Sequence, residues 1–160
     1  MYSLLHPKRS LVVCAFGVAM AFLGTSCGVE VRSTVPDAPV YYELDFTSSQ
    51  AAPLREVAGC LRITERTTER SAIGFGGLLI VHGILDADEY YAYDLACPHE
   101  AQSDVLLKVN DKLEAECPQC HSTYSIFYGG GVPTTGPAQS PLKNYMVTRS
   151  ARGLLIHNRY

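Results

Sequence analysis

The sequence predicts an all-β protein, an antiparallel β-sandwich with a small subdomain of two loops. Short stretches with alternating apolar and polar residues recur roughly every dozen positions, separated by glycine, proline, asparagine or aspartate. No helical period occurs after the first 26 residues. Tyrosine occurs ten times and tryptophan is absent, a composition that leans toward β structure. Short strands at this spacing are typical of sandwiches and small barrels.

Residues 1–26 have the layout of an export signal. Lys8 and Arg9 precede an unbroken apolar stretch at 11–23, which is too short to cross a bilayer as a helix. The following Gly24-Thr-Ser-Cys27 resembles the lipobox of bacterial lipoproteins, although Gly24 stands where leucine is usual. The resemblance implies a lipid on Cys27 and anchoring to a membrane of the bacterial cell envelope, facing the periplasm or the cell surface. The alternative is an ordinary secretory signal followed by an incidental cysteine.

The rest of the chain divides into a tether and one domain. Residues 27–39 are polar and contain Pro36 and Pro39, as expected of a tether, and the domain covers residues 40–160. In order, we expect a strand at 40–46, one or two short strands at 54–63, a charged exposed turn at 64–71, a hairpin of 78–85 and 89–95, a second hairpin of 105–109 and 112–115, a strand at 124–128, and a final hairpin of 144–149 and 153–157.

Charge excludes one class of partner. The chain has 13 basic and 16 acidic residues, for a formal net charge of −3, and no basic stripe runs along the predicted strands. Nucleic acid is therefore not an expected partner.

Two short clusters carry the chemistry. Cys97-Pro-His99 lies in a loop at 96–102, and Cys117-Pro-Gln-Cys120-His121 lies in a loop at 116–124. Each cluster places soft or borderline donors on one proline-stiffened loop, and the hairpin between them returns the second loop beside the first. Such a pair of loops suits a four-coordinate metal centre.

These clusters resemble the Rieske family, whose pattern is Cys-x-His and then Cys-x-x-His-Gly-Ser-x-Tyr/Phe, followed by Gly-Pro-Ala and Pro-Leu. Cys97-Pro-His99 matches the first part, and the run from Cys117 to Tyr124 matches the second without a gap. Gly136-Pro137-Ala138 and Pro141-Leu142 match the later elements. The resemblance covers about half the chain and implies a Rieske-like β-sandwich with a small metal-binding subdomain of two ligand loops.

The resemblance also implies a 2Fe-2S cluster, but one position departs from the pattern. Cys120 stands at the place of the second ligand histidine, and His121 at that of the glycine. The implied ligands are Cys97, His99, Cys117 and Cys120, with His121 as the substitute for Cys120. Replacing histidine by thiolate moves such clusters from roughly −150 to +300 mV toward roughly −400 mV.

Four further residues match family positions around the cluster. Ser122 and Tyr124 match residues that donate hydrogen bonds to sulfur, and Gly136 and Pro137 match a loop that shields the cluster. The implied role is electron transfer or redox sensing with an unidentified redox partner, without enzymatic activity of its own. Two alternatives remain: a structural Cys3His zinc site, and a metal-free binding module in which Cys117 and Cys120 form a disulfide.

Overall fold

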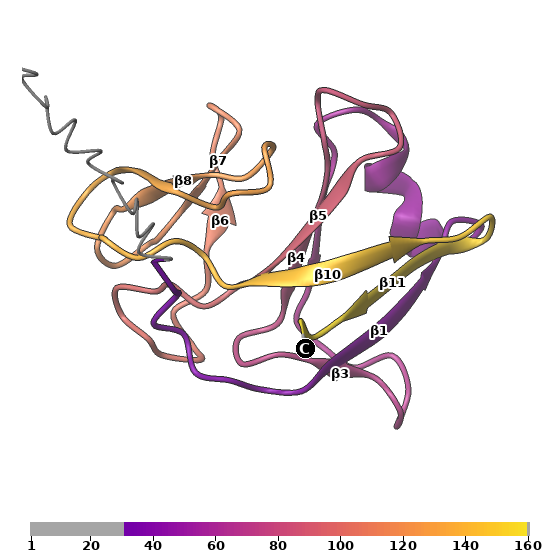
Figure 1. Cartoon of the computed structure of the whole chain (residues 1–160), viewed down its shortest axis with the longest axis horizontal. Coiled ribbons are helices and arrows are strands. Elements are labelled where there is room, and N and C mark those ends of the chain that lie inside the picture. Colours follow the sequence, from indigo (N-terminus) through magenta and orange to yellow (C-terminus); the bar gives the residue numbers. More distant parts are fainter. Residues whose placement is uncertain (1–30, 160) are drawn as a thin grey trace, which may run out of the picture.

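The computed structural model describes residues 31–159, which form two antiparallel sheets (Figure 1). The signal segment 1–26 and Cys27 lie outside the described residues. The seven-stranded sheet has the order β2-β4-β5-β10-β11-β1-β3 and the smaller sheet the order β6-β7-β8-β9. The elements are β1 (Val40–Asp45), η1 (Ser49–Arg55), β2 (Cys60–Ile63), β3 (Ala72–Ile73), β4 (Leu78–His82), β5 (Tyr90–Asp94), β6 (Lys108–Val109), β7 (Glu114–Glu116), β8 (Thr123–Ser125), β9 (Pro133–Thr135), β10 (Asn144–Arg149) and β11 (Gly153–His157). The predicted all-β antiparallel class is confirmed, and η1 is a single 3-10 helix.

The seven-stranded sheet curls until it is nearly closed. Its first strand, β1, pairs with the last strand, β11, on one side and with β3 on the other. Val40, Tyr42 and Leu44 of β1 are buried, and the residues between them face outward. This alternation follows from the period of two along a strand, with one face of β1 packed against the core.

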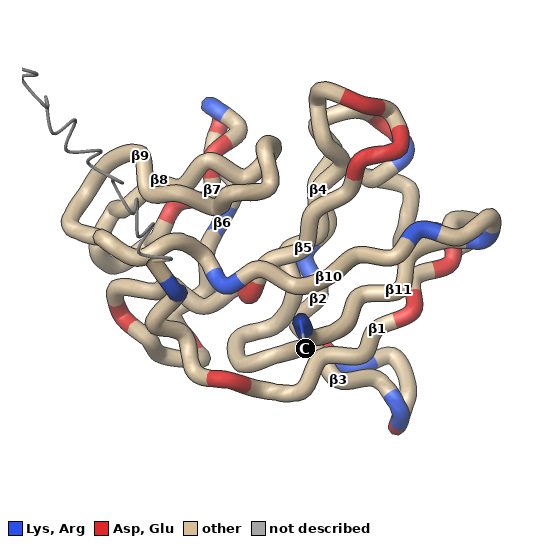
Figure 2. Tube along the Cα trace, viewed as in Figure 1, with Lys and Arg blue, Asp and Glu red and all other residues tan. Residues whose placement is uncertain are grey.

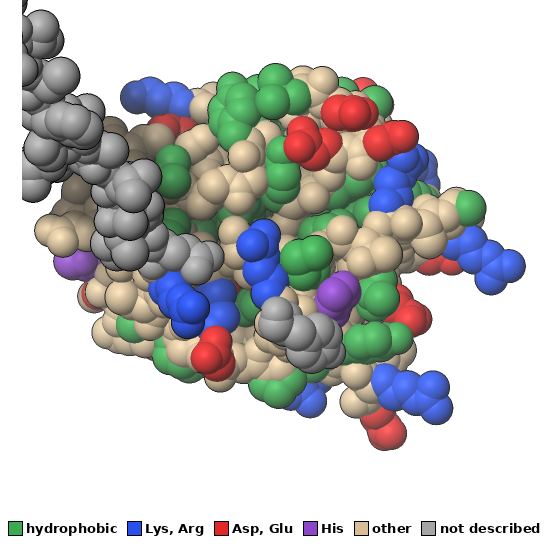
Figure 3. All heavy atoms as spheres, viewed as in Figure 1, with side chains coloured by type: hydrophobic (Ala, Val, Ile, Leu, Met, Phe, Trp, Pro, Cys, Tyr) green, Lys and Arg blue, Asp and Glu red, His purple; other side chains and the backbone are tan. Residues whose placement is uncertain are grey.

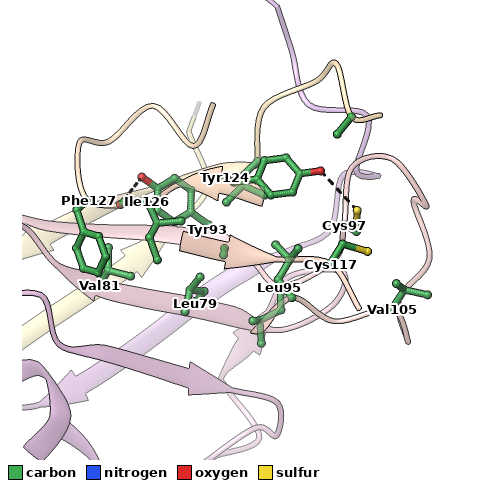
Figure 4. Packing of buried hydrophobic residues seen from close by; sticks show 14 residues of the cluster. Leu79, Val81, Tyr93, Leu95, Cys97, Val105, Cys117, Tyr124, Ile126 and Phe127 are labelled. Atoms are coloured by element: carbon green, nitrogen blue, oxygen red, sulfur yellow. Dashed lines mark hydrogen bonds between the residues drawn. The ribbon is translucent and has the colours of Figure 1, made fainter. Parts of the chain in front are cut away.

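Strand β4 separates two hydrophobic cores, and this explains why all five of its residues are buried. Leu78 and Ile80 pack in the core beneath β1 and η1. Leu79 and Val81 enter the other core, which the smaller sheet completes with Tyr124 and other residues (Figure 4). The sequence of a strand that is covered on both faces is a continuous run of apolar residues, without the alternation seen in a strand with one exposed face.

The predicted hairpins are confirmed, although some strands are shorter than expected. Strand β4 pairs with β5, β6 with β7, and β10 with β11, each as an antiparallel hairpin. The expectation of a strand from residue 54 is wrong, because 49–55 form η1 and only 60–63 form a strand. Ser48 accepts a hydrogen bond from the Ala51 amide and thereby caps the helical turn, and Pro53 has no N–H for a sheet ladder. Strands β3 and β9 have no counterpart among the predictions.

The described part of the expected tether lies against the domain. Val35 is buried, and the Lys143 ammonium donates to its carbonyl over 3.2 Å and to the Pro36 carbonyl over 3.1 Å. Lys143 also pairs with Asp37, and the Thr34 hydroxyl donates to the carbonyl of Pro98 in the first ligand loop. Residues 34–37 are thus held against the domain by the buried Val35 and by the hydrogen bonds of Thr34 and Lys143.

Candidate metal centre

The two ligand loops close with the same backbone hydrogen bond. In the first loop the Ala101 amide donates to the Cys97 carbonyl over 2.8 Å, and in the second the His121 amide donates to the Cys117 carbonyl over 3.0 Å. The donor residue has a positive φ in both loops, 50° at Ala101 and 56° at His121. Each loop is therefore one tight turn that begins at a cysteine.

Three sulfur atoms meet between these turns. The Sγ atoms of Cys97, Cys117 and Cys120 all lie within 4.8 Å of one another, and those of Cys97 and Cys120 are 3.7 Å apart. Cys97 and Cys117 are fully buried, whereas Cys120 is partly exposed. All three are free thiols, so the Cys117–Cys120 disulfide of the metal-free alternative is not formed. Three thiols this close can bind a metal ion.

A buried tyrosine lies against the first sulfur. The hydroxyl of Tyr124 in β8 is 3.5 Å from the Sγ of Cys97 (Figure 4). Burial raises the pKa of Tyr124, and its hydrogen bond with Cys97 raises the pKa further. The phenol therefore keeps its proton and can donate it to a thiolate at position 97.

A serine hydroxyl lies against the third sulfur. The Oγ atom of Ser122 is 3.2 Å from the Sγ of Cys120 and accepts a hydrogen bond from the Ala138 amide over 3.0 Å. The Cys120 thiol donates to this hydroxyl, and once the sulfur has lost its proton the hydroxyl can turn its own proton toward the sulfur. A Cβ on Gly136, whose φ is 88°, would lie 2.6 Å from the Cα of Ser122, so only glycine allows this approach. Pro137, next in the loop, is exposed.

Neither predicted histidine joins the three sulfurs. His99 and His121 are both exposed, and neither belongs to the cysteine group. The side chain of His121 is 76% exposed, with its Nδ1 3.7 Å from a carboxylate oxygen of Glu116. The structure thus brings together three of the four expected ligands and favours Cys120 over His121 at the disputed position.

The two thiols of the second loop differ in acidity. Burial raises the pKa of Cys117 to about 12. Burial also opposes ionisation of Cys120, but hydrogen bonds from the side chain and the backbone of Ser122, together with those from the thiols of Cys117 and Cys97, outweigh it and lower the pKa of Cys120. Cys120 therefore ionises before Cys117, and a metal that binds all three must displace a proton from Cys117.

The two loops are also connected directly. The Gln119 side-chain amide donates to the Glu100 carboxylate over 2.9 Å. The hairpin of β6 and β7 lies between the loops in sequence and returns the second loop beside the first. This arrangement is the one that the sequence predicted for the segment between the clusters.

One residue that supports the site was not assigned a role from the sequence. The carboxylate of Asp94, at the end of β5, is fully buried and accepts from the amides of Phe75, Gly76 and Ala96 at 2.7, 2.9 and 2.8 Å. It also accepts from the hydroxyl of Tyr145 at 2.6 Å. Because Ala96 precedes the first ligand cysteine, Asp94 fixes the start of that loop. The only signal in the sequence is its place between a buried strand and the first cluster.

The donor set suits thiophilic metals. Zinc–sulfur bonds of about 2.3 Å in a tetrahedron place neighbouring sulfurs about 3.8 Å apart. The 3.7 Å between Cys97 and Cys120 matches one such edge. The separation of this one pair is therefore compatible with a shared metal ion.

Comparisons with protein-family models and with curated proteins find no match to this chain. The assignment of a metal site is therefore based on the geometry of the three cysteines alone. Three free thiols converge at the tips of two matched turns, in an antiparallel β fold, and can bind a metal ion.

Proposed function

We propose that the chain is a metal-binding redox module of the bacterial cell envelope, held at the membrane by a lipid on Cys27. One observation carries the metal-binding part, the convergence of the three thiols of Cys97, Cys117 and Cys120. The lipid anchor rests on the lipobox resemblance. Within residues 31–159 no helix is long and apolar enough to span a membrane.

A 2Fe-2S cluster is the occupant that gives the module a function, electron transfer or redox sensing. When bound, it supplies one-electron chemistry. The register of the second loop supports it, since Ser122 and Tyr124 lie next to the sulfurs at the two positions where the Rieske pattern has sulfur-directed donors. Hydrogen bonds to cluster sulfur raise the reduction potential and would offset part of the negative shift caused by the additional thiolate.

A single zinc ion is the second candidate, and the sulfur spacing favours it. The 3.7 Å separation of the Cys97 and Cys120 sulfurs matches one edge of a tetrahedral thiolate site. Zinc would fix the two ligand loops against each other and leave the protein without redox chemistry at this site.

Metal analysis of the full chain distinguishes these occupants. Protein purified without oxygen is assayed for iron, acid-labile sulfide and zinc, and its absorption spectrum is recorded. Equal iron and sulfide with visible absorption indicate the cluster, and zinc alone indicates the second candidate. Cys97→Ser should remove the metal, whereas Cys60→Ser should retain it, because Cys60 lies outside the sulfur group. Protein that holds neither metal under these conditions contradicts the proposal.

A further inference from the structure

His82, the last residue of β4, is buried between two backbone carbonyl groups. The residue is only 4% exposed. Its Nδ1 lies 2.9 Å from the carbonyl oxygen of Leu54 in η1, and its Nε2 lies 2.9 Å from that of Ala87 in the β4–β5 loop, residues 83–89. Figure 1 shows η1 and this loop at the same end of the seven-stranded sheet. The imidazole ring thus bridges two segments that are far apart in the sequence.

The two carbonyl groups determine how many protons the ring needs. A carbonyl oxygen only accepts hydrogen bonds, and a neutral imidazole has one N–H and one nitrogen with a lone pair. A neutral ring can therefore donate to Leu54 or to Ala87, but its other nitrogen then faces an oxygen that cannot donate. Only the imidazolium form, with an N–H on each nitrogen, makes both hydrogen bonds.

The surroundings of the ring favour a positive charge. The ring of Tyr90 in β5 stacks on that of His82, with the centroids 4.5 Å apart and the planes inclined by 22°. An aromatic face attracts a cation. The β4–β5 loop has three acids, Asp86, Asp88 and Glu89 (Figure 2). Figure 3 shows acidic side chains gathered on the surface over this loop.

The other charged and titratable groups on the neighbouring elements oppose this charge only weakly. Arg149 of β10 has its guanidinium 5.9 Å from the centroid of the Tyr90 ring, but it forms an ion pair with Asp88, which offsets its charge. The remaining groups on η1, β2 and β5 are exposed, as are Arg55, Glu56 and Arg62, or pack in the core that the smaller sheet completes, as do Cys60 and Tyr91.

We propose that His82 is a proton-operated latch, in which the doubly protonated ring holds the β4–β5 loop to η1 and loss of one proton releases the loop. Histidine is the side chain whose charge ordinarily changes between about pH 5 and pH 8. The proton that remains belongs to Nδ1, because Leu54 is fully buried and no water can replace the ring there. The contact of Nε2 with Ala87 is only partly buried, so water can take its place.

Releasing the loop changes the surface of the protein. Within the loop, the amides of Asp88 and Glu89 donate to Asp86, so these hydrogen bonds do not attach the loop to η1. The loop also carries Leu85, whose exposed fraction is 74%. The position of an acidic loop with an exposed leucine therefore depends on pH. The latch is independent of the proposed metal and of the proposed lipid anchor.

Nitrogen-15 NMR of the His82 ring in the full chain tests the protonation without any substitution. At about pH 5.5 both ring nitrogens should carry protons, and at about pH 8.5 only Nδ1 should. A ring with one protonated nitrogen at both pH values would overturn the proposal. A neutral ring that keeps its proton on Nε2 would also overturn it, because the contact with Ala87 would then persist.

Hydrogen exchange of the loop amides tests the release. After correction for the intrinsic effect of pH, the amides of Asp88 and Glu89 should exchange about tenfold faster at the higher pH, since a hydrogen bond from a charged donor contributes about that factor. His82→Gln does not titrate and should abolish this pH dependence. The matched control His157→Gln, which changes a histidine of β11, should retain it. A pH dependence that persists in His82→Gln would contradict the latch.

Discussion

At the scale of single residues, the ligand that the second loop supplies depends on whether the side chain of Cys120 or that of His121 points toward the other two sulfurs. His121 has a φ of 56°, a left-handed conformation that glycine adopts most readily, and its side chain is exposed. Cys120, one residue earlier, is within reach of both other sulfurs. The backbone conformation at 121 thus accounts for a cysteine ligand followed by an outward histidine.

Substituting Cys120 and His121 one at a time should have different effects on zinc affinity. Cys120→Ser should lower zinc affinity by more than about 100-fold, because losing a ligand costs more than losing a residue that supports one. His121→Gly should leave zinc affinity unchanged and raise the free energy of unfolding by up to about 1 kcal/mol, since it relieves the left-handed conformation. Zinc titration against a competing chelator and urea unfolding measure both quantities. Loss of zinc in His121→Gly alone would assign the ligand to the histidine.

The cysteines should react with iodoacetamide in a fixed order in metal-free protein. Cys120 should be modified first near pH 8, because hydrogen bonds from Ser122 lower the pKa of its thiol. Cys60 should be slow, because burial raises its pKa to about 11, and its rate should rise about tenfold per pH unit until that pH is reached. Peptide mass spectrometry at several pH values records the order. Equal rates at Cys60 and Cys120 would contradict the difference in environment.

At the scale of elements, Asp94 joins three segments that the chain keeps far apart. Its carboxylate holds the loop at 74–77, the beginning of the first ligand loop and Tyr145 of β10. Charge-assisted hydrogen bonds to buried amides are among the stronger ones in proteins. A carboxylate within the fold therefore holds the beginning of the first ligand loop.

Asp94→Asn should lower the free energy of unfolding by about 3 kcal/mol, because the amide group presents N–H where the backbone also presents N–H. Tyr145→Phe, which removes one donor to the same carboxylate and leaves Ala96 bound, should cost only about 1 kcal/mol. Urea unfolding of the two variants measures the difference. If zinc affinity falls in Asp94→Asn and not in Tyr145→Phe, the carboxylate also positions Cys97. Equal unfolding costs would show that its contacts with the backbone amides contribute little.

The N-terminal segment should be released when its clamp is removed. Lys143→Met keeps the length of the side chain but removes the donors to Val35 and Pro36. Trypsin should then cut after Arg32 faster than in the unmodified protein, because the following residues leave the surface more often. Lys112→Met, in the turn before β7, is the matched control and should leave the rate unchanged. A rate equal to that of the unmodified protein would mean that Val35 and Thr34 suffice to hold the segment.

At the scale of the whole molecule, local sequence patterns predicted most strands. They failed where contacts between distant segments determine the local conformation. The alternation from Val40 onward and the final hairpin followed from side-chain periodicity alone. The turn at 49–55 was missed because its stability depends on burying Ala51 and Leu54 beneath strands elsewhere in the chain. Likewise, ligand spacing identified the three cysteines, but no local pattern reveals that His99 remains exposed. The direction of the His99 side chain is determined by how the whole loop packs on the domain.

The pairing of β1 with β11 has a consequence for how the protein folds. These strands come from opposite ends of the domain, with Tyr42 opposite Ile156. Contacts between such distant segments require most of the loop-closure entropy to be lost before they form, so folding should be slow and should wait for the final strand. Until β11 arrives, β1 and β10 each expose an unpaired edge, and such edges pair readily with other chains. A newly made chain would therefore be most prone to aggregation in the interval before its last residues are available.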